Sequence, residues 1–477
     1  MIRPGDRGKH PDSVQGLKGQ LDPLFYPRSI ALVGIPRGTK MGKVFLTALL
    51  DQGFPGRIFP VNPKADRIDG FKSYPSVSAI PDPVDLAILL VPYDRALPAI
   101  QECAAKGVKG AVLFTAGYGE TGTKEGKELE AALVRVARSA GMRLIGPNSM
   151  GIYAPDSGLA FFDQLPRSPG PVGIISQSGS LAVILARIAP ERGISFSKVV
   201  SVGNQCDLSS EDFLFYLGND DKTQVIGLYI EGIRYGPLFL EALRRASREK
   251  PVVLWKLGFT PEGSRAASSH TGAISGSAEI WKGLLRQGGG VHVDNFEAWV
   301  DTLMGFSLLP PAVTGDGIAI ISGPGGLAVA AAEACGKNGL RLPALSSESR
   351  KKLAAFIPPT GTSLRNPIDV GLSASMEPMI FARAARIAAA DPAVDGVVMI
   401  GTGVTSETSR QYTELIIDCK KECAKPFLVV RLPGFEAKLS RSLCEAGIPV
   451  LESPERAMST YARVRGYWLW RQEQSRP

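Results

Sequence analysis

His270 is one of three histidines in 477 residues, and it stands among small and hydroxyl side chains between Ala267 and Ala273. A neutral imidazole, with a pKa of about 6.5, keeps a free lone pair that can attack phosphorus and hold a phosphoryl group. Neighbouring hydroxyls and the backbone N–H groups beside a glycine suit phosphate oxygens. The stretch therefore indicates an exposed loop with a phosphoryl-carrying histidine, although a solvated loop histidine would have the same sequence.

A second group of polar residues follows two apolar runs of the same region. Ser176, Ser178 and Gly179 come directly after the run 172–176, where a strand would turn into a helix. Such a helix start presents N–H groups and hydroxyls to an anion, but the same serines would serve as plain helix caps. Glu231 ends the run 225–230. Strand ends and the loops after them hold the chemistry in open α/β sheets, so Glu231 and His270 are expected to share one crevice.

The elements that position these residues form three series of strands and helices. The first series contains five short apolar runs alternating with helical segments, which predicts a parallel α/β domain with a Gly-rich turn after its first strand. Its runs are 29–34, 57–61, 85–92, 110–114 and 143–148. The turn at 34–42 does not have the G-x-G-x-x-G spacing, and the second strand ends at Lys64 rather than at an acidic ribose partner, which disfavours NAD.

The second and third series look like divergent copies of one another. The turn 176–181 corresponds to 322–327, and 250–253 corresponds to 425–428, which indicates an internal duplication. The third series has no histidine, so the copy would not share the work of His270.

Composition limits the functions that the chain can have. With 44% hydrophobic and 21% charged residues it reads as an ordinary globular protein of several domains. Its net charge of +8 comes without a basic block, so nucleic acid is not implied. The sequence has no run of eighteen apolar residues, so no membrane span is predicted. Its six cysteines form no CxxC pair, which indicates free thiols in the cytoplasm and no metal site.

Taken together, six short motifs resemble the α part of NDP-forming acyl-CoA synthetases (acetate–CoA ligase, ADP-forming), relatives of the succinate–CoA ligase α subunit. The motifs are at 61–64, 145–148, 176–179, 201–204, 229–232 and 269–272. The resemblance implies an α/β fold with a Rossmann-like CoA-binding domain followed by two flavodoxin-like parallel α/β domains. We expect an N-terminal tail at 1–22 and domains at 23–160, 170–310 and 315–477.

The resemblance also implies roles for individual residues. His270 would be phosphorylated, Glu231 would hold the second ring nitrogen of His270, and Ser176, Ser178 and Gly179 would bind phosphate. The turn from Pro36 to Lys40 and Lys64 would hold the CoA phosphates, and the residues near 91 and 115 would line the pantetheine path. The expected CoA-binding set is Gly34, Pro36, Arg37, Gly38, Thr39, Lys40, Lys64, Val91, Pro92, Thr115, Ala116, Gly117 and Asn148.

The complete reaction of this family needs an ATP-grasp module, which this sequence lacks. The resemblance therefore implies a separate ATP-grasp β subunit, an α2β2 assembly, and ADP or ATP with Mg on that partner. The alternatives are a CoA or acyl-CoA sensor of the same fold, a related ligase that transfers a carbamoyl or similar group, and a nicotinamide dehydrogenase. Retention of His270 together with Glu231 argues against the sensor, because a sensor needs neither.

Overall fold

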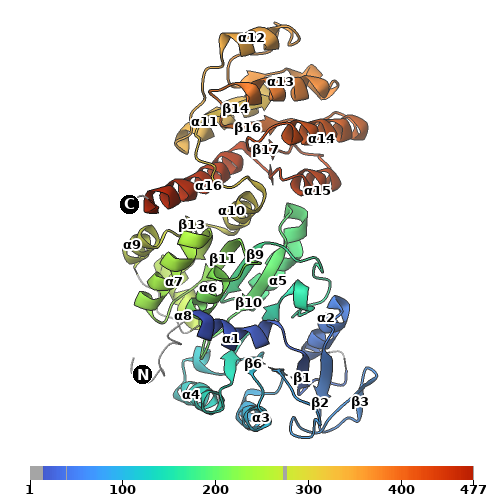
Figure 1. Ribbon diagram of the computed structural model, residues 1–477, viewed down its shortest axis with the longest axis vertical. Coiled ribbons are helices and arrows are strands. Elements are labelled where there is room, and N and C mark those ends of the chain that lie inside the picture. The colour runs from blue at the N-terminus through green and yellow to red at the C-terminus, as the bar shows by residue number, and fades with distance from the viewer. Residues whose placement is uncertain (1–13, 39, 272–276, 476–477) are drawn as a thin grey trace. The chain divides into compact units, whose positions relative to one another are not determined.

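The first sheet is parallel, with the strand order β2-β1-β5-β6-β7. Its strands β1, β2 and β6 are labelled in Figure 1. Its central strands are buried at every position, which explains why they read as continuous apolar runs. The strands are β1 (Ser29–Val33), β2 (Arg57–Val61), β5 (Leu86–Leu89), β6 (Gly110–Leu113) and β7 (Arg143–Ile145). The connecting helices are α2 (Val44–Gln52), α3 (Tyr93–Lys106) and α4 (Lys124–Ser139), and a hairpin of β3 (Arg67–Ile68) and β4 (Phe71–Lys72) follows β2.

The computed structural model describes residues 14–38, 40–271 and 277–475. The chain divides into two compact units. The first unit runs to Arg187 and resumes at Ser195–Val293, and the second takes Ile188–Ile194 and the chain from Asp294 onward. The expected bounds of the three domains stay predictions.

The second sheet belongs to the first unit and has the order β13-β12-β11-β9-β10-β8. Its strands are β8 (Gly151–Tyr153), β9 (Val172–Ser176), β10 (Phe196–Ser201), β11 (Val225–Ile230), β12 (Val252–Lys256) and β13 (Val291–Val293). Its helices are α5 (Gly179–Ile188), α6 (Ser210–Gly218), α7 (Gly236–Glu249), α8 (Pro261–Thr271) and α9 (Ala278–Gly288). Strand β8 pairs antiparallel with β10, so residues 151–153 of the expected first domain complete the second sheet.

The third sheet, in the second unit, repeats this arrangement. Its order, β15-β14-β16-β17-β18, matches β10-β9-β11-β12-β13 strand for strand, as a duplication predicts. The strands are β14 (Ile318–Ser322), β15 (Ile368–Asp369), β16 (Gly396–Ile400), β17 (Phe427–Val430) and β18 (Val450–Leu451). The helices of this unit are α10 (Phe296–Leu308), α11 (Gly325–Lys337), α12 (Ser347–Ala354), α13 (Met379–Ala390), α14 (Ser406–Lys421), α15 (Ala437–Glu445) and α16 (Pro454–Gln474). The α/β class with one Rossmann-like and two flavodoxin-like sheets is confirmed.

Equivalent lysines in the two copies make equivalent contacts. Lys250 Nζ, just before β12, donates to the carbonyl of Asp220 at 2.5 Å, and Lys425 Nζ, just before β17, donates to the carbonyl of Asp391 at 2.9 Å. Both lysines thus fix the loop that precedes the neighbouring strand.

The prediction of an N-terminal tail at 1–22 is wrong for the second half of that range. Residues from Val14 to Phe25 form helix α1, and residues 1–13 lie outside the described part. Leu17, Leu21 and Leu24 are buried, and their spacing places them on one helix face. Helix α1 packs on α6, where the rings of Phe25 and Tyr216 stack with centroids 4.7 Å apart. The apolar spacing was present in the sequence and was overlooked.

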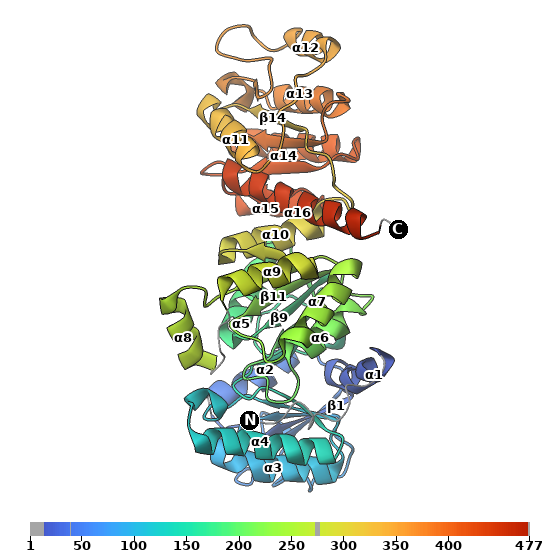
Figure 2. The ribbon, with the colours of Figure 1, turned by 90° about the vertical axis from the view of Figure 1, so that its left-hand side faces the viewer.

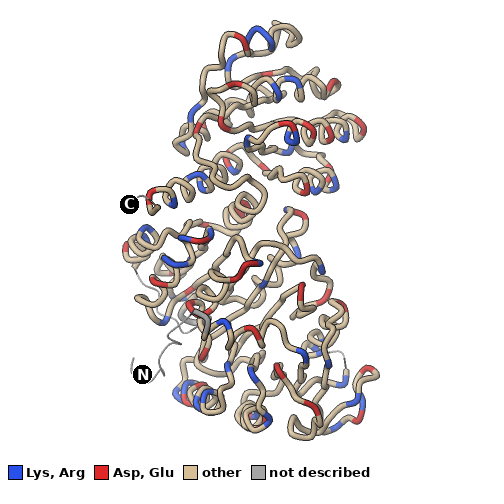
Figure 3. The backbone as a smooth tube through the Cα atoms, viewed as in Figure 1, with Lys and Arg blue, Asp and Glu red and all other residues tan. Residues whose placement is uncertain are grey.

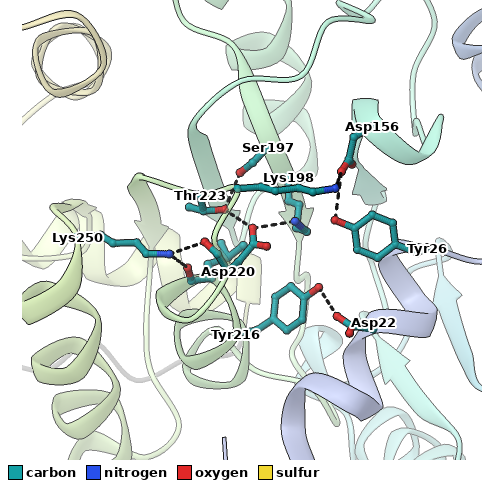
Figure 4. A network of polar contacts seen from close by, with 11 residues as sticks. Asp22, Tyr26, Asp156, Ser197, Lys198, Tyr216, Asp220, Thr223 and Lys250 are labelled. Atoms are coloured by element: carbon teal, nitrogen blue, oxygen red, sulfur yellow. Dashed lines mark hydrogen bonds and ion pairs between the residues drawn. The ribbon is translucent and has the colours of Figure 1, made fainter. Parts of the chain in front are cut away.

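Polar contacts between α1 and the second sheet add to this packing (Figure 4). Tyr216 donates from its hydroxyl to Asp22 at 2.8 Å. Beside it, the fully buried Lys198 donates to Asp220 at 2.8 Å, and Thr223 donates to the same carboxylate oxygen at 2.6 Å. A buried ammonium ion is stabilised when its charge is paired in this way.

Charges of both signs are mixed along the described chain (Figure 3), which agrees with the absence of a basic block in the sequence. None of the described helices is long and apolar enough to cross a membrane.

Candidate active site

The loops at the carboxyl edge of the first sheet bring the expected CoA-binding residues together. Gly34 follows β1 with a φ of 83°, and its N–H donates to Val61 at 2.9 Å. A Cβ atom there would lie 2.6 Å from Val91 Cγ1, so only glycine allows the loops after β1 and β5 to approach this closely. Thr115 then joins the next loop, because its hydroxyl donates to the carbonyl of Val91 at 2.5 Å.

The remaining expected residues extend this edge. The N–H of Asn148, which follows a cis Gly146–Pro147 bond, donates to the carbonyl of Thr115 at 3.0 Å. At the other side, Asn62 fixes the turn that carries Lys64 by accepting the N–H of Lys64 at 2.8 Å. Exposed residues of these loops are Arg37, Gly38, Lys40, Lys64, Pro92 and Ala116, with Pro36 and Gly117 half-buried, while Thr39 lies outside the described residues. The exposed cations Arg37, Lys40 and Lys64 suit an anionic ligand.

The turn at 176–179, which we expect to bind phosphate and call the phosphate turn, follows β9. Ser176 is fully buried and donates to the carbonyl of Ser178 at 2.7 Å, which shapes the turn. The Ser178 hydroxyl accepts the N–H of Leu181 at 3.3 Å and so caps α5. Ser178 is therefore a helix cap. The first N–H groups of α5 have no carbonyl acceptor within the helix, so they are the groups of this turn that are suited to an anion.

Gly179 lies where this turn meets the first domain. A Cβ atom at Gly179 would lie 2.7 Å from Met150 Cγ, just after the Gly-Pro-Asn motif. Met150 is itself held by the hydroxyl of Ser201 at 3.1 Å. The phosphate turn and the loop that carries Asn148 are thus close neighbours.

Glu231 is buried at the end of β11, next to this turn. The Tyr229 hydroxyl donates to Glu231 Oε1 at 3.0 Å, and burial followed by the nearby Glu231 charge raises the pKa of Tyr229, so the phenol stays protonated. Gln177 accepts the backbone N–H groups of Glu231 and, at 3.1 Å, Gly232. Gln177 also donates to the carbonyl of Gly232 at 2.5 Å, so this side chain locks the phosphate turn to the Glu231 loop.

Lys256 ends the adjacent strand β12 and was not singled out from the sequence. Its ammonium donates to the carbonyls of Glu231, at 2.9 Å, and Leu257, and it faces the rings of Phe259 and Trp281 at about 5 Å. Burial lowers the pKa of Lys256 to about 8, although the Glu231 charge opposes the shift. The sequence could have marked Lys256 as a candidate site residue, because it ends an apolar run in the same way as Glu231 follows one.

His270 is not in a loop, which corrects the expectation from the sequence. It stands in the last turn of α8 (Figure 2), and residues 272–276 lie outside the described part. Ala and Ser are compatible with a helix, and Pro261 suits a first helical position, so the small residues were misread as loop-forming. The side chain of His270 is not among those described, and its pairing with Glu231 stays a prediction.

The remaining polar groups of this region include a buried ion-pair cluster and the cysteines. Asp207 is fully buried and accepts from Arg143 at 2.9 Å and Arg138 at 2.7 Å. In the part of the chain that the structure describes, no three His, Cys, Asp or Glu side chains gather as a metal site. All six cysteines are free thiols.

A parallel first sheet is followed by a flavodoxin-like second sheet, in which β9 and β11 end at the turn 176–179 and at the buried Glu231. These are features expected of the acyl-CoA synthetase class. Three family models match the chain: a CoA-binding domain at 28–155, a succinyl-CoA ligase-like flavodoxin domain at 169–306 and a ligase-CoA domain at 318–424.

Named relatives agree with this class. The chain is 37% identical to the α subunit of acetate–CoA ligase (ADP-forming) II of Pyrococcus furiosus, over 93% of this chain and 97% of that protein. It is 34% identical to the isoenzyme I α subunit, over 94% and 98%. A solved structure, Ca. Korarchaeum cryptofilum dinucleotide-forming acetyl-coenzyme A synthetase 1 in complex with phosphate and ADP, matches with a TM-score of 0.85 and 33% identity, over 96% of this chain and 99% of that one. The chain belongs to the family of α subunits of ADP-forming acetate–CoA ligases.

Proposed function

We propose that this chain, with a separate ATP-grasp β subunit, interconverts acyl-CoA, phosphate and ADP with a carboxylic acid, CoA and ATP. Phosphate attacks the thioester carbonyl, which releases CoA and forms an acyl phosphate. A ring nitrogen of His270 then attacks the phosphorus, which releases the carboxylate and leaves phosphohistidine. The β subunit transfers this phosphoryl group to ADP, and the reverse sequence makes acyl-CoA.

The residues of this chain bind and orient the reactants. Gly34 and the loops at 36–40, 64, 91–92, 115–117 and 148 hold CoA, with Lys40 and Lys64 at its phosphates. The N–H groups at the start of α5, beside Ser178 and Gly179, bind the attacking phosphate and later the phosphohistidine. Glu231 accepts the N–H of the second ring nitrogen of His270, which fixes the tautomer and makes the attacking nitrogen more basic.

The observation that carries the proposal is the buried Glu231, fixed by Tyr229 and Gln177 beside the phosphate turn. A buried carboxylate in this position is suited to orient an imidazole by accepting its N–H. The family membership of the chain supports the same assignment.

The partner carries the nucleotide chemistry. We assign ADP or ATP and Mg to an ATP-grasp β subunit in an α2β2 assembly, because both relatives are named as α subunits. The free thiols favour a reducing cytoplasm as the place of action.

The test is intact-mass analysis of the purified chain after incubation with acetyl phosphate, or with acetyl-CoA and phosphate. We expect an acid-labile phosphate adduct on the wild type and none on His270→Ala. If CoA binds and no adduct forms, even with a β subunit present, the chain is a CoA sensor of the same fold.

A further inference from the structure

Two carboxylates outside the site described above lie where three of its loops meet. Glu120 stands in the 3-10 turn η2 (Gly119–Thr121), and Glu130 stands in α4. The loops are those after β6, β10 and β11, and each of them carries or borders residues of the proposed site. The sequence offered no motif that marks either glutamate.

Glu120 holds the loop that we expect to line the pantetheine arm. Its carboxylate accepts the N–H of Gly117 at 2.5 Å and that of Tyr118 at 3.1 Å. It also accepts from the side-chain amide of Asn204, which belongs to the loop after β10. One carboxylate therefore joins the CoA side of the site to the second sheet.

Glu130 connects the turn η2 and the loop after β10 to the loop that begins at Glu231. It accepts the N–H of Gly119 at 3.1 Å, the amide of Asn204 at 3.2 Å and the guanidinium of Arg234 at 3.1 Å. The same Arg234 nitrogen donates to the carbonyl of Asn204 at 3.0 Å. Arg234 stands three residues after Glu231, so Glu130 ties the loop after β11 to helix α4.

Asn204 is the centre of this arrangement and is almost fully buried. Its N–H donates to the carbonyl of Pro147 at 3.0 Å, next to Asn148. Helix α8, which carries His270, packs against η2, so the turn with Glu120 also touches that helix. Hydrogen bonds to charged groups are stronger than those between neutral groups, and these contacts therefore hold the three loops together.

We propose that Glu120, Glu130, Asn204 and Arg234, the carboxylate clamp, set the distance between the thioester of bound CoA and the phosphate turn with its histidine. These are positioning residues, and the proposal rests on the function proposed above. Attack of phosphate on a thioester requires the reacting atoms to be aligned within a few tenths of an ångström, and a misplacement of about 1 Å can cost about 100-fold in rate. Transfer of phosphate to His270 from a free acyl phosphate does not involve CoA and does not need this alignment.

The test uses Glu120→Gln and Glu130→Gln in the full chain. Each carboxylate faces three N–H donors, and glutamine would place its NH2 group against one of them while keeping the size of the side chain. The matched control is Glu128→Gln, in the same helix as Glu130, because Glu128 is exposed and its ion pair among the described residues is with Lys124, at 3.7 Å.

Each protein is phosphorylated by two routes, acetyl-CoA with phosphate and acetyl phosphate alone, and the rate of adduct formation is measured by mass spectrometry. For both clamp variants we expect about a 100-fold loss by the CoA route, a change below about twofold by the acetyl phosphate route, and a CoA dissociation constant within about threefold of the wild type. The Glu128→Gln control should match the wild type by both routes.

Two results would overturn the proposal. Equal losses by both routes would show a general structural role, and unchanged rates by the CoA route would show that the clamp does not position the thioester. Absence of any adduct on the wild type with acetyl phosphate would instead refute the proposed function, and the clamp proposal with it.

Discussion

Two neighbours hold Glu231: Tyr229 donates to its carboxylate, and Gln177 accepts its backbone N–H. Replacing it by glutamine keeps the size but presents an NH2 group or a weaker acceptor to the imidazole. We therefore expect Glu231→Gln to slow phosphorylation by acetyl phosphate by about 10²–10⁴-fold, the range for a positioned acid or base.

The binding of CoA should not change in this variant, and calorimetry would verify that. Glu241→Gln, an exposed residue paired with Arg245, is the control. A Glu231→Gln chain that is phosphorylated at the wild-type rate would remove Glu231 from the mechanism.

Lys256 gives the second prediction at the residue scale. Its folded-state pKa of about 8 lies below the ordinary value of 10.5, so between these values the unfolded chain binds more protons. The free energy of unfolding therefore rises with pH in this window, by about 2 kcal/mol between pH 7.5 and 9.5 from this group alone. Below pH 8 the charged ammonium imposes its full desolvation cost.

Guanidinium titrations of the wild type and Lys256→Met at both pH values test this prediction, because contributions from other groups cancel in the difference. The difference should grow in favour of the wild type as the pH rises. The exposed Lys282→Met serves as control, and parallel pH dependences of wild type and Lys256→Met would contradict the desolvation of Lys256.

At the scale of elements, the approach of the loops after β1 and β5 depends on Gly34. Gly34→Ala would add both a strained positive φ and a 2.6 Å contact with Val91, so the loop must move away. We expect CoA to bind about tenfold more weakly, or worse, by calorimetry, since displaced donors no longer meet the ligand.

Two further variants separate the causes. Gly53→Ala has a similar φ of 68° and open space around it, so it reports the backbone strain without the contact. Val91→Ala removes the 2.6 Å contact with Val91 Cγ1, so Gly34→Ala should weaken CoA binding less in a Val91→Ala chain than in the wild type; Val91→Ala alone is the reference, because Val91 is itself an expected CoA-binding residue. Equal weakening in both chains would show that strain, and not the approach of the loops, sets the effect.

Asp207 joins α4 and β7 to the loop after β10. Burial opposes its ionisation, but Arg143 and Arg138 outweigh it and keep the pKa of Asp207 below its ordinary value of 3.8. Asp207→Asn leaves both guanidinium groups without their charge partner and should cost about 3 kcal/mol of unfolding free energy at pH 6.

Because folding lowers the pKa of Asp207, its ionised carboxylate stabilises the fold at pH values above its ordinary pKa of 3.8. This stabilisation is lost as the pH falls through the folded-state pKa of Asp207. Denaturant titrations at pH 6 and pH 3 should therefore show the wild type and Asp207→Asn converging in acid. Glu241→Gln should cost less than about 1 kcal/mol at either pH, because its ion pair is exposed. A constant difference between wild type and Asp207→Asn would contradict this origin.

Much of this arrangement was predictable at the element scale. Buried parallel strands read as apolar runs, and their polar ends, Ser176 and Glu231, marked the site. The helix around His270 and helix α1 were missed because small residues and a short amphipathic segment resemble a loop and a tail. Lys256 could have been marked by its place at the end of an apolar strand. The carboxylate clamp could not be found, because Glu120 is 84 residues from Asn204 and Glu130 is 104 residues from Arg234, so these side chains meet only in the folded unit.

For the whole molecule, the duplicated sheet predicts how many phosphates one chain can carry. The third sheet repeats the strand order of the second, but Gly401 follows β16 where Glu231 follows β11, and residues 315–477 contain no histidine. We expect one acid-labile phosphate per chain at saturating acetyl phosphate, by intact mass. A second acid-labile phosphate that remains in the His270→Ala variant would contradict the prediction that only the second sheet carries a phosphorylated residue.

Strand β8 has a practical consequence for dissecting the protein. The CoA-binding family model ends at 155, yet residues 151–153 pair with β10 of the following sheet. A fragment cut at 155 would carry an unpaired strand, and the remainder would expose the edge of β10, which is a template for aggregation. Chimeras with other ligases should therefore be joined before Gly151, so that strand β8 stays with its partner β10.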